Sequence, residues 1–479
     1  MILRTNLIAA AAFILLASTR SCEAKAAFRP QSALAPIHKE EANAAVWMRQ
    51  SEQSKLTKIR GGSSDSSKSS LSTAMFNLVK GIVGVGVLSL PAGVAAFGDA
   101  KSAVIPGVAL IAIIGSFSGY NFGLIGRVCA YTGANSYSNA WEKSVGAKSA
   151  WLPALFCTCK TFLAVLAYSM VLAETFQGIA GGMGIAASRA QTLVTLTSTI
   201  LLPLCLMKNL SSLAPFSLLG IIGMLLTVAA MAVRYFDGSY ALPAGKFLEG
   251  LAQFPTFGSK GASAVFSPNA FIMVCMLSTA FMAHFNAPKF YIELENNTLE
   301  RYNTLVTVSF GISILIFSVA TALGFATFGK SSLGFVLSNY SSKDSLIGLI
   351  RVVVAFSLIF TYPLVFVGCR DGVLSLLKIP EEKQTNSFLN QLTVAILSVI
   401  TIAAINLRDL SFVLSFGGAT LGNALIYIFP ALMFRKVVKD MGDAAPAKLK
   451  NETYFATFSM LLGIGMGIVG ANMSLQTLK

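Results

Sequence analysis

Long apolar runs, separated by short polar gaps, follow one another along the chain from residue 74 almost to its end. Most runs hold about 20 residues, the length that an α-helix needs to cross the hydrocarbon core of a bilayer. The pattern therefore predicts one all-α membrane domain at 73–476 with about eleven transmembrane helices. The predicted spans are 74–97, 103–126, 151–176, 190–207, 213–235, 263–288, 303–328, 345–369, 387–406, 409–434 and 453–474.

The composition of the chain excludes an ordinary soluble protein. Charged residues make up 12% and hydrophobic residues 54% of the 479 positions, and the mean hydropathy is +0.69. A soluble domain carries roughly 25% charged residues. The net charge of +15 is attributed to basic cytoplasmic loops, whose Lys and Arg bias predicts a cytoplasmic start at residue 73. No basic block with interleaved aromatic residues indicates a nucleic-acid partner, so the expected partner is the lipid bilayer.

Residues that carry catalysis or bind metals are scarce. The chain has seven cysteines, most of them within apolar runs and none in a C-x-x-C pair, and only two histidines. This usage predicts no disulfide framework, no metal site and no cofactor. No predicted helix carries paired carboxylates, an H-E-x-x-H motif or a Ser/His/Asp set, so the sequence predicts that the protein is not an enzyme.

The first 26 residues have the pattern of a targeting signal. Arg4 precedes an apolar run of eleven residues, Leu7–Ala17, and Ala24–Ala26 offers a small-x-small cleavage site. The run is too short to span a bilayer. Residues 1–26 are therefore predicted to be a signal peptide, with a first transmembrane helix as the alternative.

The segment at 27–72 is rich in Ser and Ala, and we predict that it is disordered and resembles a transit peptide. Its start, with Phe28 and Pro30 in the stretch AAFRP, resembles the bipartite plastid-targeting signal of algae with secondary plastids. The resemblance implies a multi-pass integral protein of a plastid membrane. A secretory, vacuolar or other endomembrane destination stays open.

Glycine and proline crowd the middle of the first predicted span, which holds Gly81, Gly84, Gly86, Pro91 and Gly93 within thirteen residues. Each glycine costs a helix about 1 kcal/mol relative to alanine, and proline costs about 3 kcal/mol. Such a helix is predicted to unwind at mid-membrane, which is tolerated where the backbone lines a cavity. Close helix packing through small residues is the alternative.

The sixth predicted span is interrupted by His284, Asn286 and Pro288. A lone histidine is more often a packed side chain than a ligand, but polar groups inside a membrane mark functional sites. Pro288 can open a second half-helix because its missing N–H needs no acceptor there. Two interruptions five spans apart indicate a five-plus-five inverted repeat, with broken helices 1 and 6 and the substrate at the breaks.

The two interruptions offer complementary chemical groups. Exposed N–H groups after the first break suit a carboxylate, and free carbonyls at Ala280–Ala283 suit an ammonium group. A ligand that carries both groups is an α-amino acid. The candidate substrate-binding residues are Val83, Gly84, Val85, Gly86, Val87, Ala280, Phe281 and His284.

The sequence resembles the amino acid/auxin permease family, which includes plant vacuolar and animal neutral amino acid transporters. The stretches that carry the resemblance are NLVKGIVGVGVLSLP (77–91), TAFMAHFNAPKFYIELENNT (279–298) and GGATLGNALIYIFPALMF (417–434), with TYPLVFVGCR (361–370) as weaker support. The resemblance covers residues 72–475. It implies a LeuT-type fold with eleven helices and secondary active transport of amino acids.

The resemblance also bears on the coupling ion. Sodium-coupled relatives carry an Asn where this chain has Lys80, whereas Thr361 matches their sodium-binding Thr. The lysine charge would occupy the place of the sodium ion and repel it, which predicts transport that is proton-linked or uncoupled. The alternative is that Lys80 extends to the cytoplasmic interface. The gate candidates are Glu293, which belongs to the family's Tyr-x-Glu-Leu pattern, Asn286 and Pro288.

Two charged residues, Lys160 and Glu174, lie within the third predicted span. They are about 21 Å apart along a helix and therefore cannot pair. The sequence names no partner for Lys160.

Two other functions stay open. The same fold could bind an amino acid and signal through a soluble tail, as a nutrient sensor, but the tail here has at most 71 residues and few aromatic ones. A carrier for another organic acid or an auxin-like solute would need no ammonium site. Transport of an amino acid is the leading hypothesis, and backbone contacts alone do not name the amino acid.

Overall fold

The computed structural model describes residues 68–207, 218–249, 251 and 253–477. The predicted signal peptide at 1–26 lies outside the described residues, as does most of the predicted transit-like segment at 27–72. The last two residues of that segment, Leu71 and Ser72, already belong to a helix, so the membrane domain begins slightly earlier than predicted.

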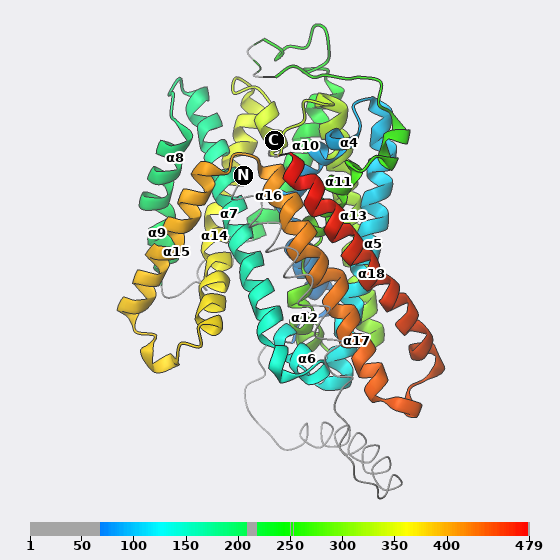
Figure 1. The fold of residues 1–479 in the computed structure, drawn as a ribbon. Helices are drawn as coiled ribbons and strands as arrows, with labels where there is room; N and C mark the ends of the chain where they lie inside the picture. The colour runs from blue at the N-terminus through cyan, green and yellow to red at the C-terminus, as the bar shows by residue number, and fades with distance from the viewer. Residues whose placement is uncertain (1–67, 208–217, 250, 252, 478–479) are drawn as a thin grey trace, which may run out of the picture. The chain divides into compact units, whose positions relative to one another are not determined.

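Within the described residues the helices form two sets of five spans, and each set opens on an interrupted helix (Figure 1). The first set is α3 (Leu71–Ile82), η1 (Val85–Ser89) and α4 (Leu90–Phe97); α5 (Val104–Thr132); α7 (Trp151–Gly182); α8 (Arg189–Leu196), η4 (Thr197–Leu201) and α9 (Leu202–Cys205); and α10 (Leu218–Phe236). The second set is α11 (Ala270–Ala280), η8 (His284–Asn286) and α12 (Ala287–Glu293); α13 (Leu299–Phe328); α14 (Ser345–Leu376); α15 (Asn386–Asn406); and α16 (Leu410–Gly417), η11 (Gly418–Gly422), η12 (Ala424–Ile428) and α17 (Phe429–Asp440). The last helix is α18 (Ala447–Gln476), and shorter connecting elements include α6 (Tyr137–Ser144) and η9 (Val336–Asn339).

The predicted spans coincide with these helices in position, but some of the helices are shorter than a membrane-spanning helix. Among the described residues, eight helices are long and apolar enough to cross a membrane, and α3 with α4 forms a further span bent by 41° at its break. The other two predicted spans are present as shorter helical stretches, α8 to α9 and α10. The all-α membrane architecture and the interruption of the first and sixth spans are therefore confirmed.

The helices begin where the sequence supplies capping side chains. Ser70, Thr298, Asp344, Thr385 and Asp409 each accept a hydrogen bond from a backbone N–H in the first turn of the following helix. Such bonds satisfy N–H groups that have no acceptor within the helix.

The interrupted helix α11 lies at the centre of the packing. It contacts α4 of the other interrupted span and also α16, η11 and α18. Around this centre α7 packs along α14, and α5 packs along α13. Figure 1 shows α8, α9, α14 and α15 on one side of the molecule and α5, α13, α17 and α18 on the other. The two breaks are therefore held in the interior.

The tenth span contains two π-helical turns, η11 and η12, which the sequence did not predict. Gly418 lets η11 lie directly against α11, because a Cβ at this position would overlap the α11 backbone. Side chains from other helices bond to backbone carbonyls of this span: Thr279 donates to Leu414 at 2.6 Å, and Tyr137 donates to Leu425 at 2.8 Å. These bonds fix the tenth span to its neighbours.

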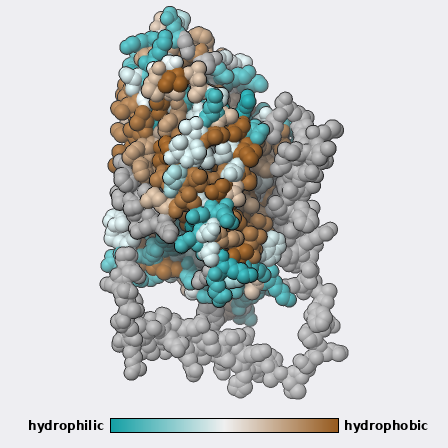
Figure 2. All heavy atoms as spheres, turned by 90° about the vertical axis from the view of Figure 1, so that its left-hand side faces the viewer, coloured by the Kyte–Doolittle hydropathy of each residue, from teal (hydrophilic) through white to brown (hydrophobic). Residues whose placement is uncertain are grey.

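The outer surface suits a bilayer. Val394, Val399 and Ile402 on α15 are between 45% and 61% exposed, an exposure of apolar side chains that hydrocarbon accepts and water does not. In Figure 2, apolar residues cover much of one face, and hydrophilic residues gather toward its two ends.

Candidate substrate and ion site

The first break leaves a small number of N–H groups for a ligand. The helix α3 ends at Ile82, Gly84 is extended, and Val85 opens the one-turn helix η1. The N–H groups of Val83, Gly84 and Val87 already donate to backbone carbonyls. The first N–H groups of a helix have no acceptor within it, which leaves the N–H of Gly86, in the first turn of η1, as a candidate donor. Gly86 lies within the predicted carboxylate site at 83–87.

The second break leaves a carbonyl opposite them. Beyond the end of α11, the Phe281 N–H donates to Leu277, and the Met282 N–H donates to Thr279. Among the described residues none donates to the carbonyl of Ala280, at the last position of α11. A Cβ built on Gly86 would lie 3.8 Å from the Ala280 Cα. The donor and the acceptor predicted for an amino acid therefore lie on backbone segments in contact with each other.

His284, a predicted substrate-binding residue, is buried away from the candidate site. Its Nε2 lies 2.9 Å from the carbonyl oxygen of Ser118 on α5, and its ring lies edge-on to Phe122 at 5.5 Å. Because a carbonyl can only accept, Nε2 carries the proton. The Phe281 side chain is buried against Phe317 on α13. The structure therefore gives both side chains packing roles, and only the Phe281 backbone stays near the break.

A cavity of about 120 Å³ lies between the two breaks. It is enclosed by residues of the first, third, sixth and tenth spans, namely Gly81, Ile82, Gly84, Gly86, Lys160, Leu163, Ala164, Ala167, Tyr168, Thr279, Ala280, Met282, Val413, Leu414, Gly417 and Leu421. The sequence predicted the walls from the first and sixth spans. It missed the walls from α7 and α16, because nothing in an apolar run shows which face lines a cavity.

A second, smaller cavity of about 90 Å³ brings the predicted ion-site residues together. Lys80 and Thr361 both line it, and Gly84 and Tyr168 line both this cavity and the one between the breaks. The Thr361 Oγ1 donates to the Ser357 carbonyl at 2.8 Å. The charge of Lys80 and the hydroxyl of Thr361 therefore share a space that adjoins the candidate substrate site.

The gate candidates have different environments. Pro288 occupies the first turn of α12, which fits its predicted role in opening the second half-helix, and Asn286 ends η8. Glu293 is largely exposed and lies 3.8 Å from Lys289 on the same helix. An exposed ion pair within one helix contributes little, so this pair by itself links no two elements.

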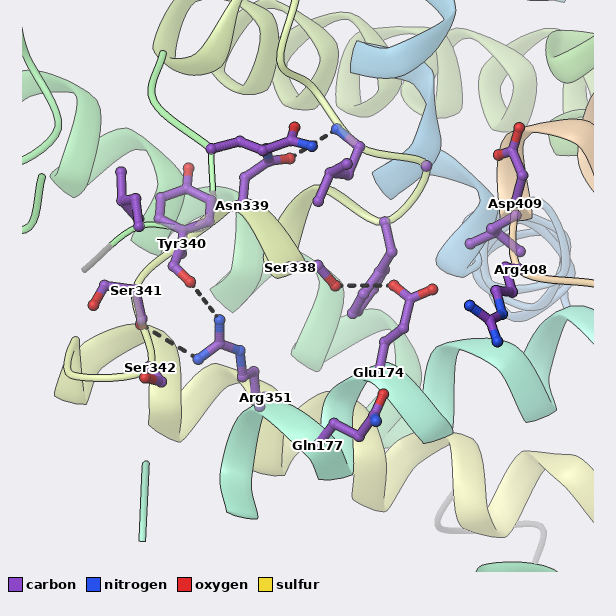
Figure 3. Close-up of a pocket in the computed structure, with 17 residues that line it drawn as sticks. Glu174, Gln177, Ser338, Asn339, Tyr340, Ser341, Ser342, Arg351, Arg408 and Asp409 are labelled. Atoms are coloured by element: carbon purple, nitrogen blue, oxygen red, sulfur yellow. Dashed lines mark hydrogen bonds between the residues drawn. The ribbon is translucent and has the colours of Figure 1, made fainter. Parts of the chain in front are cut away.

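A larger hollow of about 680 Å³ is lined by several charged and polar residues to which the sequence assigned no role (Figure 3). Glu174 accepts from Ser338 at 2.9 Å and lies 3.5 Å from Arg189, so it does not pair with Lys160, as predicted. Arg351 is buried and donates to the carbonyls of Leu337, Tyr340 and Ser341 in and beside η9. These contacts hold the loop between α13 and α14 against α7 and α14.

The family of the chain follows from comparison with known proteins. A family model described as "Transmembrane amino acid transporter protein" matches residues 67–473. The chain belongs to this family. Membership confirms the resemblance found in the three sequence stretches, and with it amino acid transport as the function.

Several relatives match most of the chain. The Danio rerio protein named "Putative sodium-coupled neutral amino acid transporter 11" is 25% identical and covers 86% of this chain and 86% of its own. The Arabidopsis thaliana "Amino acid transporter AVT6E" is 22% identical and covers 87% of this chain and 86% of its own. The Saccharomyces cerevisiae "Vacuolar amino acid transporter 2" is 22% identical and covers 76% of this chain and 75% of its own.

A solved structure, "Crystal structure of MhsT in complex with L-phenylalanine", aligns with 83% of this chain and 98% of its own at 14% identity. Its TM-score is 0.46, and this likeness supports no conclusion about the substrate.

Proposed function

We propose that this transporter is a secondary carrier that binds the amino acid in the cavity between the interruptions of its first and sixth spans. The observation that carries the proposal is that Gly86 at the first break and Ala280 at the second lie in contact and line one cavity. A carboxylate is stabilised by helix N-terminal N–H groups, and an ammonium by carbonyls at a helix C-terminus. Uptake of labelled amino acids into proteoliposomes, with a panel of amino acids, tests this proposal.

The same assay separates transport from the sensor hypothesis. A protein that binds an amino acid but accumulates none, under any imposed ion gradient, would be a sensor. Uptake of auxin-like or other organic acids without uptake of amino acids would favour the third hypothesis, a carrier that needs no ammonium site.

For the coupling ion, we expect uptake to continue when sodium is replaced by choline, and to respond to an imposed proton gradient if it is coupled at all. The reason is that Lys80 and Thr361 line one small cavity, and a tethered ammonium repels a second cation in a medium of low dielectric constant. Lys80→Asn, which restores the residue of sodium-coupled relatives, is expected to make uptake respond to sodium.

The control for this variant is Lys289→Asn, which replaces a lysine that is 70% exposed on α12. It is expected to behave as the wild type. Strict sodium dependence of the wild type would contradict the prediction. Unchanged uptake in both Lys80→Asn and Lys80→Ala would favour the alternative in which Lys80 extends to the membrane interface.

For localisation, we propose that residues 1–72 direct the protein to a plastid membrane. The support comes from the short apolar run Leu7–Ala17 and from the AAFRP stretch around Phe28. A fusion of residues 1–72 to a fluorescent protein, expressed in a diatom, is expected to reach the plastid, whereas the fusion with Phe28→Ala is expected to stay outside it. A fusion retained in the secretory pathway or the vacuole, with or without Phe28, would refute the proposal.

A further inference from the structure

We propose that Lys160 binds a second negative charge on the substrate, so that the site prefers amino acids with a carboxylate side chain. The inference rests on the proposed function and specifies its substrate class. It follows from the position of Lys160 in the wall of the cavity between the two breaks.

Lys160 lies on α7 and contributes to the wall of the 120 Å³ cavity. It is the one charged residue among the described residues that line this cavity. The α7 residues beside it in the wall are Leu163, Ala164, Ala167 and Tyr168, and all of them except Tyr168 are apolar. Among the described residues, the cavity is therefore lined mostly by apolar ones, with Tyr168 and Thr279 as polar residues and Lys160 as the cationic one.

An aromatic ring of the protein lies beside the ammonium group of Lys160. The Lys160 Nζ lies 4.2 Å from the centroid of the ring of Phe285, which belongs to η8 within the second break. A ring face attracts a cation but carries no net charge. Among the described residues, no carboxylate lies within 4.0 Å of Lys160. A ligand carboxylate in the cavity would provide the countercharge that the protein does not.

The α-carboxylate of the substrate does not serve as the countercharge of Lys160, because it is bound elsewhere. The N–H of Gly86 at the first break already suits it, and the Ala280 carbonyl suits the α-ammonium. A zwitterion bound in this way would leave Lys160 without a countercharge. An aspartate or glutamate side chain adds one negative charge and a reach of one or two methylene groups, which the apolar wall of α7 accommodates.

The test compares acids with their neutral amide analogues, which have nearly the same shape. Uptake of labelled glutamate and glutamine, and of aspartate and asparagine, is measured in proteoliposomes without sodium. For the wild type, we expect KM to be lower for the acid by at least about tenfold, because a hydrogen bond to a charged group contributes roughly that much.

Lys160→Met keeps the length and apolar stem of the side chain and removes its charge. It is expected to reduce the acid-to-amide ratio to about one while uptake of glutamine persists, whereas Lys160→Arg keeps the preference. The matched control is Lys101→Met, since Lys101 also lies over a ring, that of Phe257 at 5.2 Å, but not in this cavity. It should leave the ratio unchanged.

Two outcomes would overturn the inference: a wild type without preference for acids, or a preference that survives Lys160→Met. If the wild type transports no amino acid, the proposed function fails. The inference is then decided by thermal unfolding of the purified protein with glutamate or glutamine. Equal stabilisation by both ligands would refute it, and selective stabilisation by glutamate that is lost in Lys160→Met would uphold it.

Discussion

Replacing Gly86 by valine is expected to abolish amino acid uptake while the protein still folds and inserts. Gly86 lines the cavity, and a Cβ placed on it would already lie in van der Waals contact with Ala280, 3.8 Å from its Cα and 3.9 Å from its Cβ. The two further methyl groups of valine must then occupy the space proposed for the substrate. Gly86 is not among the glycines with positive φ, so the backbone conformation itself accepts a side chain.

The measurement is uptake in proteoliposomes, normalised to folded protein by size-exclusion chromatography. Gly86→Ala is expected to have a partial effect, because the added methyl meets no overlap. Gly465→Val is the matched control, since Gly465 is exposed on α18 and a Cβ there meets no atom within 4 Å. Normal uptake by Gly86→Val would place the substrate elsewhere.

Replacing Asp344 by alanine is expected to destabilise the protein by about 3 to 5 kcal/mol, the usual cost of removing one partner of a buried ion pair. The Asp344 side chain is fully buried and accepts from Arg234 Nε and Nη2 at 2.8 and 2.7 Å. It also accepts from the Tyr240 hydroxyl at 2.9 Å and caps the first turn of α14. The variant would leave Arg234 and Tyr240 without this partner and α14 without its cap.

Thermal unfolding of the detergent-solubilised protein measures this effect. Asp237→Ala is a close control, because Asp237 also accepts from Arg234 at 2.8 Å but its side chain is 34% exposed. Exposed pairs contribute about 0 to 1 kcal/mol, so a small shift is expected there. Equal losses in the two variants would show that burial of Asp344 does not govern its contribution.

The backbone features of the site could be predicted from sequence because they depend on residue types that break helices. The glycines between Gly81 and Gly93 and the residues from His284 to Pro288 marked both interruptions, and the structure has breaks at both. The pairing of Lys80 with Thr361 around one cavity also agrees with the sequence. The breaks follow from the local sequence alone, whereas the joint place of Lys80 and Thr361 was implied by the resemblance to sodium-coupled relatives.

Side-chain directions could not be predicted, because they depend on packing between helices. His284 turns to α5 and bonds to Ser118, although its position beside the break suggested a ligand. Lys160 enters the cavity because one face of α7 is turned inward, and a helix that is apolar on all sides does not reveal that face. The π-helical turn η11 lies against α11, and neither η11 nor η12 left a mark in the apolar pattern.

The irregular backbone of the sixth and tenth spans is separated from lipid. The outer helix α15, of which 28% is buried, is an unbroken α-helix of 21 residues. The spans with the second break and with the π turns are 72% and 89% buried. Hydrocarbon offers no partner to an N–H or carbonyl that loses its bond, so a helix that rearranges must be solvated by protein. Because protein surrounds them, the sixth and tenth spans can exchange hydrogen bonds during a transport cycle without exposing unpaired backbone groups to lipid.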